Sequence, residues 1–520
     1  MRITFLGHAG FCVETSRAIV ITDPWLSPSG AFDSAWFQYP RNHHLAAYVQ
    51  DRLADARKER FVYLSHEHKD HFDPAFLESL RCRDFTVVIA DFRRAYLKSV
   101  FAEYHCKDVV VCSHVQEVEI PGGKLKLYLD DSELNRDSAI LIEAEGQTFL
   151  NLNDCRIFDA LPTIAHEQGP IDVFTCQFSG AGWHPTCYEY PRQTYEAIAR
   201  KKMIAKFNSV AQAIRSVAPR VFVPSAGPPC FLDPSLSHLN FEAVNIFPRA
   251  PKLLQFLQPR LRAVDTSLLE LMPGDVLDVD TCTIAYETKD RVSEETFEPY
   301  IRAYMASYEG FFLERQRQYQ DRDGGMELIG RLGQALQEKL DVLTLHDRVQ
   351  TPVYFCLDDL PDQMLRVDFP AKRVDLASRI EDDNHYSITA PSWEVARVLD
   401  GKITWDDFSL TFRMRLNREP DVYQTVVQGF LRLEPEDMNW FCSKLLNIES
   451  NQERIVVEAG GKRYAVDRYC PHQGGDLTQA WIEDERFLTC ARHQWQFDLE
   501  QDGNARKNEG SIHAVCLDDD

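Results

Sequence analysis

The stretch His66-Glu67-His68-Lys69-Asp70-His71 places four potential metal ligands within six residues, a density far above that of an ordinary surface loop. An apolar run, Phe61-Val62-Tyr63-Leu64, precedes it and is typical of a buried strand, so we expect the ligands at that strand's carboxyl end. His66 and His68 alternate onto one side of the loop, whereas Asp70 and His71 turn towards a second centre. The spacing therefore predicts two metal ions close together, with a chance polar turn as the alternative.

Length and composition limit the class of protein. A chain of 520 residues is too long for one hydrophobic core, so we expect roughly two to four domains. The apolar and charged fractions, 44% and 26%, are those of a globular protein, and no segment reaches the roughly 20 apolar residues of a membrane span. A formal net charge of −23 argues against binding to nucleic acid or membranes. Because Met1–Phe5 enters a strand-like pattern at once, we expect no signal peptide and a cytoplasmic location.

A second ligand set lies near the carboxyl end. Cys470-Pro471-His472 is followed by Cys490-Ala491-Arg492-His493, and the remaining cysteines of the fourteen are scattered, which favours reduced thiols over disulfides. A Cys-x-His pair followed by a Cys-x-x-His pair is the pattern of a Rieske [2Fe–2S] cluster, in which two thiolates hold one iron and two imidazoles the other. A structural zinc site is the alternative. Gly474-Gly475 and the strand-rich surroundings favour the cluster, with Trp495 and Phe497 packed beneath it.

The amino-terminal region resembles the metallo-β-lactamase fold, in which two β-sheets are sandwiched between helices. The resemblance rests on strand-like runs and tight turns over residues 3–26, followed by the His66–His71 stretch. Asp23 stands where the family braces its ligand loop. His8 either orients a ligand or is a hydrogen-bonded buried histidine. This pattern is specific for the fold and leaves the reaction open.

The same resemblance implies further ligands. A strand over Thr148–Asn153 delivers Asp154 to the place of an aspartate that bridges both metals. The loop before it normally supplies a histidine, but this chain offers Glu133, with Asp130 and Asp131 nearby. Because added carboxylates favour harder, redox-active metals over zinc, the exchange points to iron or manganese.

The last ligand stays open at this stage. Val221–Pro224 resembles the family's final strand, but no histidine stands at its end. Asp233 is the first choice for the missing ligand, and His238 and His184 are the alternatives. The basic run Arg200–Lys206 is either a solvated helix face or a place where a phosphate or carboxylate binds.

Together these patterns predict an α/β chain with three domains. A metallo-β-lactamase αββα sandwich over residues 1–290 would hold the dinuclear site. A mixed α+β middle domain over residues 291–445 carries no recognisable ligand set and would cover or position the site. A small all-β Rieske domain would occupy residues 446–520.

An electron-transfer cluster has no role in hydrolysis, so its partner metals are expected to change oxidation state, which zinc cannot do. We therefore predict a non-haem diiron monooxygenase whose metal ligands are its catalytic residues. One atom of O2 would enter a small anionic metabolite by C-hydroxylation or N-oxygenation, and the other would become water. Electrons would come from NAD(P)H through a ferredoxin or flavin reductase. A homo-oligomer would let the Rieske domain serve a neighbouring chain.

The middle region carries a more specific resemblance. Asp400–Asp407 and Leu416–Tyr423, with the pairing of the two metal domains, resemble the CMP-N-acetylneuraminate hydroxylase family, over residues 1 to about 440. That family hydroxylates the N-acetyl methyl group of a nucleotide-linked sialic acid. Here the Rieske domain follows the lactamase-type domain instead of preceding it, and Glu133 and Asp233 fall where the family carries histidines. The resemblance therefore implies the oxygenase class and leaves the substrate open.

Three other functions remain open from the sequence. A hydrolase of the same fold would use a metal-bound hydroxide against an ester or phosphodiester. A diiron O2 or nitric-oxide reductase would use the Rieske domain to pass electrons to the irons and would need no organic substrate. A redox sensor would not turn over at all.

Overall fold

The computed structural model describes residues 1–131, 136–286, 291–320 and 325–518, and the chain divides into two compact units. The first unit covers most of residues 1–312, and the second covers Trp183–Pro191 and Leu313–Asp520. Within the described ranges, no helix has both the length and the apolar character needed to cross a membrane.

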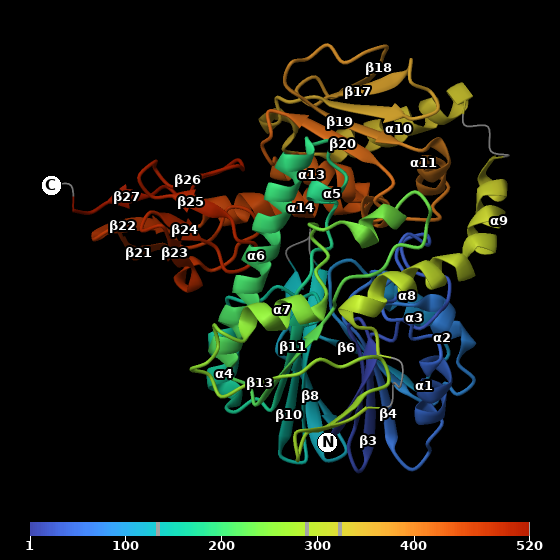
Figure 1. The fold of residues 1–520 in the computed structure, drawn as a ribbon. Coiled ribbons are helices and arrows are strands. Elements are labelled where there is room, and N and C mark those ends of the chain that lie inside the picture. The colour runs from blue at the N-terminus through green and yellow to red at the C-terminus, as the bar shows by residue number, and fades with distance from the viewer. Residues whose placement is uncertain (132–135, 287–290, 321–324, 519–520) are drawn as a thin grey trace. The chain divides into compact units, whose positions relative to one another are not determined.

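Two sheets packed face to face form the first unit, with helices on their outer faces (Figure 1). The apolar layer between the sheets contains Phe5, Phe11 and Phe61 from one sheet and Ile140 and Phe149 from the other. The rings of Phe11 and Phe149 meet edge to face at 5.2 Å. Burial of such side chains from both sheets is the main force that holds a sandwich together.

The described strands and helices of this unit have the following bounds. One sheet has the order β15-β14-β1-β2-β3-β4-β5-β6, with β1 Arg2–Gly7, β2 Gly10–Glu14, β3 Ala18–Thr22, β4 Glu59–Leu64, β5 Thr86–Ala90, β6 Asp108–Cys112, β14 Val276–Asp278 and β15 Thr283–Ala285. The other has the order β13-β12-β11-β10-β9-β8-β7, with β7 Glu117–Ile120, β8 Gly123–Asp131, β9 Arg136–Ala144, β10 Gln147–Asn151, β11 Val173–Gln177, β12 Val221–Ser225 and β13 Ser267–Leu268. The helices are α1 Leu45–Leu53, α2 Pro74–Ser79, α3 Tyr96–Glu103, α4 Leu161–Gln168, α6 Arg192–Val217, α7 Ala250–Leu257 and α8 Glu294–Ser307.

Strand β4 has the buried character that its sequence predicts. It lies between two parallel neighbours, with Val20 opposite Phe61 and Val62 opposite Val87. A strand covered on both faces needs apolar residues at every position, which explains the continuous run Phe61–Leu64. The loop that carries His66–His71 leaves its carboxyl end.

The turn between β1 and β2 carries His8. Its backbone has φ 52° at His8 and φ 106° at Gly7, where a Cβ would also lie 2.7 Å from the Asn42 side-chain nitrogen. Gly7 is therefore required by both conformation and space. The backbone nitrogen of Ala226 donates to the carbonyl of His8 at 2.8 Å, which places His8 beside the end of β12.

The second unit contains a five-stranded sheet with helices and a strand-rich carboxyl-terminal part. The sheet has the order β18-β17-β16-β19-β20, with β16 Val353–Leu357, β17 Met364–Asp368, β18 Arg373–Ala377, β19 His385–Ala390 and β20 Arg415–Glu419. The helices are α5 Trp183–Thr186, α10 Gly325–Val342, α11 Ser392–Leu399, α12 Trp405–Leu410, α13 Thr425–Arg432 and α14 Pro435–Ser450, while α9, Glu309–Gln320, runs from the first unit into the second. Two small sheets follow, β21-β22-β27 and β23-β24-β25-β26, with β21 Arg454–Ala459, β22 Lys462–Asp467, β23 Trp481–Glu483, β24 Phe487–Thr489, β25 Gln496–Asp498, β26 Asn504–Ala505 and β27 Val515–Cys516.

The domain boundaries predicted from the sequence, at residues 290 and 445, remain a prediction. Helix α8 packs on the first unit through Ile301 and Tyr304, which share an apolar cluster with Phe37 and Leu232. Helix α14 continues across residue 445. Domain limits depend on such long-range packing, which residue patterns do not reveal.

Candidate metal centres

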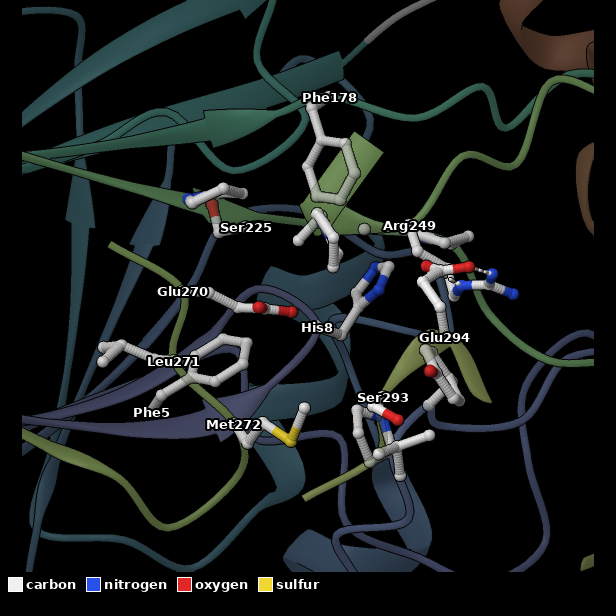
Figure 2. A pocket seen from close by; sticks show the side chains of 18 residues that line it. Phe5, His8, Phe178, Ser225, Arg249, Glu270, Leu271, Met272, Ser293 and Glu294 are labelled. Carbon is white, nitrogen blue, oxygen red and sulfur yellow. Dashed lines mark hydrogen bonds and ion pairs between the residues drawn. The ribbon is translucent and has the colours of Figure 1, made fainter. Parts of the chain in front are cut away.

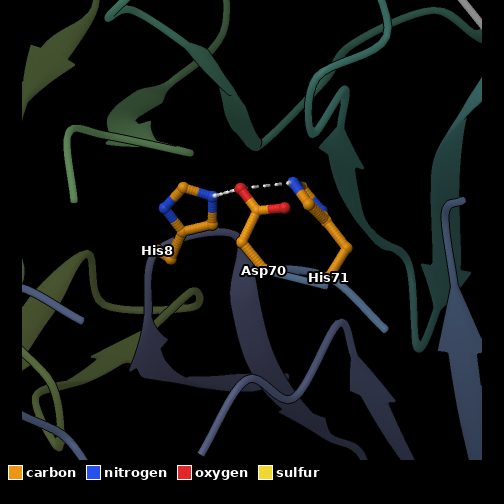
Figure 3. A group of neighbouring side chains, drawn as sticks. All are labelled: His8, Asp70 and His71. Atoms are coloured by element: carbon orange, nitrogen blue, oxygen red, sulfur yellow. Dashed lines mark ion pairs between the residues drawn. The ribbon is translucent and has the colours of Figure 1, made fainter. Parts of the chain in front are cut away.

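Two groups of potential ligand atoms meet at the carboxyl ends of β4 and β10. His66, His71 and Asp154 form one group, and His8, Asp70 and His71 form the other (Figure 3). In each group the ligand atoms lie within 4.8 Å of one another. The Nε2 atom of His71 lies 3.6 Å from Asp154 Oδ1 and 3.9 Å from Asp70 Oδ2. His68 joins the first group through a 2.8 Å contact between its Nδ1 and His66 Nε2.

These residues fit a metal centre on a direct observation. The Nε2 atom of His71, Oδ1 of Asp70 and Oδ1 of Asp154 are buried and make no hydrogen bond with any described residue. A buried polar atom left unsatisfied costs about 1–3 kcal/mol, and a bound cation can satisfy such atoms on neighbouring ligand side chains. Imidazole nitrogens with carboxylate oxygens suit iron, manganese and zinc.

Asp23 fixes the orientation of His71. Its Oδ2 lies 2.8 Å from His71 Nδ1, and both side chains are fully buried. The hydroxyl and backbone nitrogen of Ser65 donate to the same carboxylate at 2.6 and 2.8 Å. A proton on Nδ1 of His71, held by Asp23, leaves Nε2 to face Asp70 and Asp154.

The charges of the centre favour ionised carboxylates. Burial by itself raises the pKa of Asp70, but the neighbouring His71 and the hydrogen bond from His8 lower it to about 2. Burial also opposes ionisation of Asp154, and the same His71 charge holds its pKa well below its usual range. Ionised carboxylates are the form that binds metal.

His8 is a member of the centre that the sequence left undecided. Its Nε2 lies 3.1 Å from Asp70 Oδ2, and its ring meets the ring of His71 at 5.2 Å. It stands at the end of β12, where the final family ligand is expected. Asp137, on β9, was not singled out from the sequence; its Oδ1 lies 2.9 Å from His66 Nδ1.

Of the remaining candidate ligands, the structure describes three, and each makes other contacts or is exposed. Glu133 lies outside the described residues. The Oδ1 atom of Asp233 accepts hydrogen bonds from the backbone nitrogen and the hydroxyl of Ser235, at 2.9 and 2.7 Å. His238 is exposed. The ring of His184 contacts Tyr190 and Arg418. None of Asp233, His238 and His184 belongs to a ligand group among the described residues.

The basic run on α6 is largely a solvated face. Arg200, Lys201 and Lys202 are exposed. Lys206 turns inward and donates to the side-chain oxygen of Gln177 at 2.6 Å. An anion site over this run stays a prediction.

The carboxyl-terminal ligand set sits on two loops with matching turns. The backbone nitrogen of Cys470 donates to Gly475 and that of Cys490 donates to Trp495, both at 2.9 Å. Both thiols are buried, and no described cysteine is in a disulfide. A Cβ at Gly475 would lie 3.0 Å from Cys490 Sγ, so the close approach of the loops leaves little room for a side chain there.

The two histidines of this set lie side by side. The rings of His472 and His493 are 4.8 Å apart, and Trp495 stacks on His472 at 4.4 Å. Two thiols and two imidazoles that converge from facing loops fit a [2Fe–2S] cluster.

Comparison with known families identifies both regions. Residues 2–225 match the β-lactamase superfamily domain, and residues 435–514 match the Rieske [2Fe-2S] domain. The chain joins a β-lactamase superfamily domain to a Rieske domain. This combination confirms the predicted fold class and the predicted order, with the Rieske domain after the lactamase-type domain.

Similar proteins align with most of the length of this chain. A Rieske 2Fe-2S iron-sulfur protein of Mycolicibacterium smegmatis is 29% identical over 96% of this chain and 97% of its own length. Cytidine monophosphate-N-acetylneuraminic acid hydroxylase of Danio rerio is 23% identical over 81% of this chain and 70% of its own length. Among solved structures, CmlA, a diiron β-hydroxylase from Streptomyces venezuelae, has a TM-score of 0.37 and 15% identity, with 53% of each chain covered. The two matched domains together support an iron-dependent oxygenase.

Proposed function

We propose that the protein is an O2-dependent monooxygenase that acts on a small metabolite, with a dinuclear non-haem iron centre reduced through the Rieske domain. The proposal depends most on one observation: a centre with two overlapping ligand groups and unsatisfied buried ligand atoms shares its chain with a one-electron carrier. A hydrolase would have no use for that carrier, because a Lewis acid does not change oxidation state.

The ligand groups suggest which described residues would hold the two irons. We assign His66, His68 and Asp154 to one iron, and Asp70 and His71 to the other. Glu133, which lies outside the described residues, is our sequence-based choice for a further ligand of the first iron. His8 replaces Asp233 as our choice for the last ligand, since its imidazole lies at Asp70 and its backbone carbonyl accepts from Ala226, just after β12. When bound, such a pair of irons supplies the two electrons needed to split O2.

The four predicted Rieske ligands are two thiols and two imidazoles, and each pair would hold one iron. Cys470 and Cys490 would hold one iron of the cluster, and His472 and His493 the other. When bound, the cluster supplies one-electron transfer at a potential above that of all-cysteine clusters. We infer that NAD(P)H is the ultimate electron source, through a ferredoxin or flavin reductase, and that a homo-oligomer is compatible with this arrangement.

Neighbouring side chains fix the orientation of the metal-ligand histidines. Asp23 and Ser65 hold the ring of His71 in one orientation, and Asp137 does the same for His66. These fixed partners keep the ligands from reorganising when the metals change charge.

Metal analysis and spectroscopy test the proposal. The purified full-length chain should bind about four iron atoms, two in the cluster and two in the dinuclear centre. The reduced protein should show the electron paramagnetic resonance signal of a histidine-ligated cluster, and an oxygenase substrate should couple O2 uptake to an oxygenated product. Two zinc ions per chain without redox-active iron outside the cluster would refute the oxygenase.

A further inference from the structure

A cavity of the first unit meets the metal centre at His8, which belongs both to the cavity wall and to a ligand group (Figure 2). Most of the wall is apolar. It includes the side chains of Phe5, Tyr39, Phe178, Leu271, Met272 and Val292. A ligand in this cavity would therefore lie beside the centre and place hydrocarbon against the wall.

Two of the charged side chains in the wall neutralise each other. Arg249 forms a two-bond ion pair with Glu294, in which Arg249 Nε lies 3.1 Å from Glu294 Oε1. The guanidinium also lies 3.7 Å from the ring centroid of Phe297. Because its hydrogen-bonding face is taken by a carboxylate, Arg249 is poorly placed to bind an anionic ligand.

Glu270 is the third charged group of the wall, and its carboxylate is different. It makes no hydrogen bond or ion pair with any described residue, and it points towards His8 across the cavity (Figure 2). Arg291 is bound to the buried carboxylate of Asp275 at 2.5 Å and donates a hydrogen bond to the backbone oxygen of Glu270, so its charge lowers the pKa of Glu270 without a direct bond to that carboxylate. Burial raises the pKa of Glu270, which reflects the partial loss of water around it.

The lining therefore carries one carboxylate that has no hydrogen-bonded or ion-paired partner among the described residues, in an apolar setting. A partly dehydrated carboxylate interacts strongly with a cation that can replace its lost water, and repels an anion. Resting on the proposed function, we propose that this cavity binds the ammonium group of a small amine substrate, held by Glu270 beside the metal centre. This assignment replaces the anionic substrate expected from the sequence.

Binding of three small probes tests the inference on the iron-loaded, full-length protein. n-Butylammonium, butyrate and 1-butanol share one hydrocarbon length and differ in charge. Their dissociation constants can be measured by ligand-observed saturation-transfer nuclear magnetic resonance. Butylammonium should bind at least about tenfold more tightly than butyrate, and 1-butanol should fall between them.

Substitutions test whether the charge of Glu270 causes the preference for butylammonium. Glu270→Gln keeps the side-chain shape and should weaken butylammonium binding by about tenfold, leaving the three probes nearly equal. Glu270→Asp, which retains the charge, should keep the order of the probes even if Gln impairs folding. Glu298→Gln serves as a matched control, because Glu298 is exposed on α8 and bonded to Arg302.

The outcomes separate this inference from the proposed function. Tighter binding of butyrate, or an unchanged preference in folded Glu270→Gln, overturns the ammonium site even if the protein proves to be an oxygenase. Loss of the preference in Glu270→Gln, with the control unchanged, supports the site even if the centre holds zinc and consumes no O2.

Discussion

The hydroxyl of Tyr423 lies 3.3 Å from Nε2 of His472, so a residue that precedes α13 touches a predicted ligand of the Rieske cluster. Backbone hydrogen bonds hold this contact in place: Tyr423 donates to Lys507 and accepts from Glu509, both at 3.1 Å. Tyr423 ends the segment Leu416–Tyr423, one of the stretches that resemble the hydroxylase family. The segment therefore has a physical role inside the second unit, at the cluster.

Replacement of this tyrosine should change the reduction potential of the cluster. With the proton of His472 on Nε2, the hydrogen bond to Tyr423 increases the negative character of the imidazole and favours the oxidised cluster. Tyr423→Phe should therefore raise the potential, by on the order of 20–60 mV for one hydrogen bond in a one-electron couple. A redox titration followed by electron paramagnetic resonance measures it.

The neighbouring Tyr469 provides the control for that experiment. It precedes the ligand Cys470, and its hydroxyl makes no hydrogen bond among the described residues. Tyr469→Phe should leave the potential unchanged. Equal shifts in the two variants would mean that loss of any nearby hydroxyl, rather than the bond to His472, alters the cluster.

Loss of the Asp23 carboxylate charge should loosen the iron centre. Asp23→Asn keeps the shape of the side chain, but it weakens the hold on His71 Nδ1 and on the Ser65 hydroxyl. Changes of this kind typically weaken metal binding by 10–100-fold. Iron retained after dialysis against a graded chelator measures the effect, with the cluster's visible absorption as an internal reference. An unchanged chelator profile would show that His71 keeps its orientation without Asp23.

Loss of a cluster ligand should separate electron supply from the first reaction cycle. His472→Ala removes one of the two predicted imidazole ligands, so the cluster should no longer pass electrons. Once chemically reduced, freed of excess reductant and supplied with an oxidisable substrate, the variant should consume about one O2 per chain and then stop, whereas the wild type continues with its reductase. Loss of this single uptake as well would argue that His472 also serves the dinuclear centre.

The local parts of the site were predictable from sequence, and the long-range parts were not. Strand β4 and the ligand loop are adjacent in the sequence, from Glu59 to His71, so an apolar run and a cluster of ligand types predict them together. His8 comes from the β1–β2 turn, more than fifty residues earlier in the chain, and its carbonyl accepts from Ala226, just after β12 of the other sheet. The bond between Asp137 and His66, and the position of Trp183–Pro191 in the second unit, depend on tertiary packing in the same way.

A buried lysine in the second unit should make stability depend on pH. Lys339 is 1% exposed, and its Nζ lies 4.1 Å from the ring centroid of Trp405. Burial lowers its pKa from 10.5 to about 7, although Glu434 and Asp406 oppose the shift. Between these two values the unfolded chain holds a proton that the folded chain has lost, so the free energy of unfolding should rise with pH.

The contribution of Lys339 can be isolated by difference. One such group adds a slope of up to about 1.4 kcal/mol per pH unit, and Lys339→Met removes it. Urea unfolding at pH 7.5, 8.5 and 9.5 should therefore give a steeper rise for the wild type than for Lys339→Met, and other titrating groups cancel in the comparison. Lys402→Met, at an exposed lysine of the same unit, should retain the wild-type slope. Parallel profiles for all three proteins would show that Lys339 keeps its proton in the folded state, stabilised by Glu434 and Asp406 more strongly than burial destabilises it.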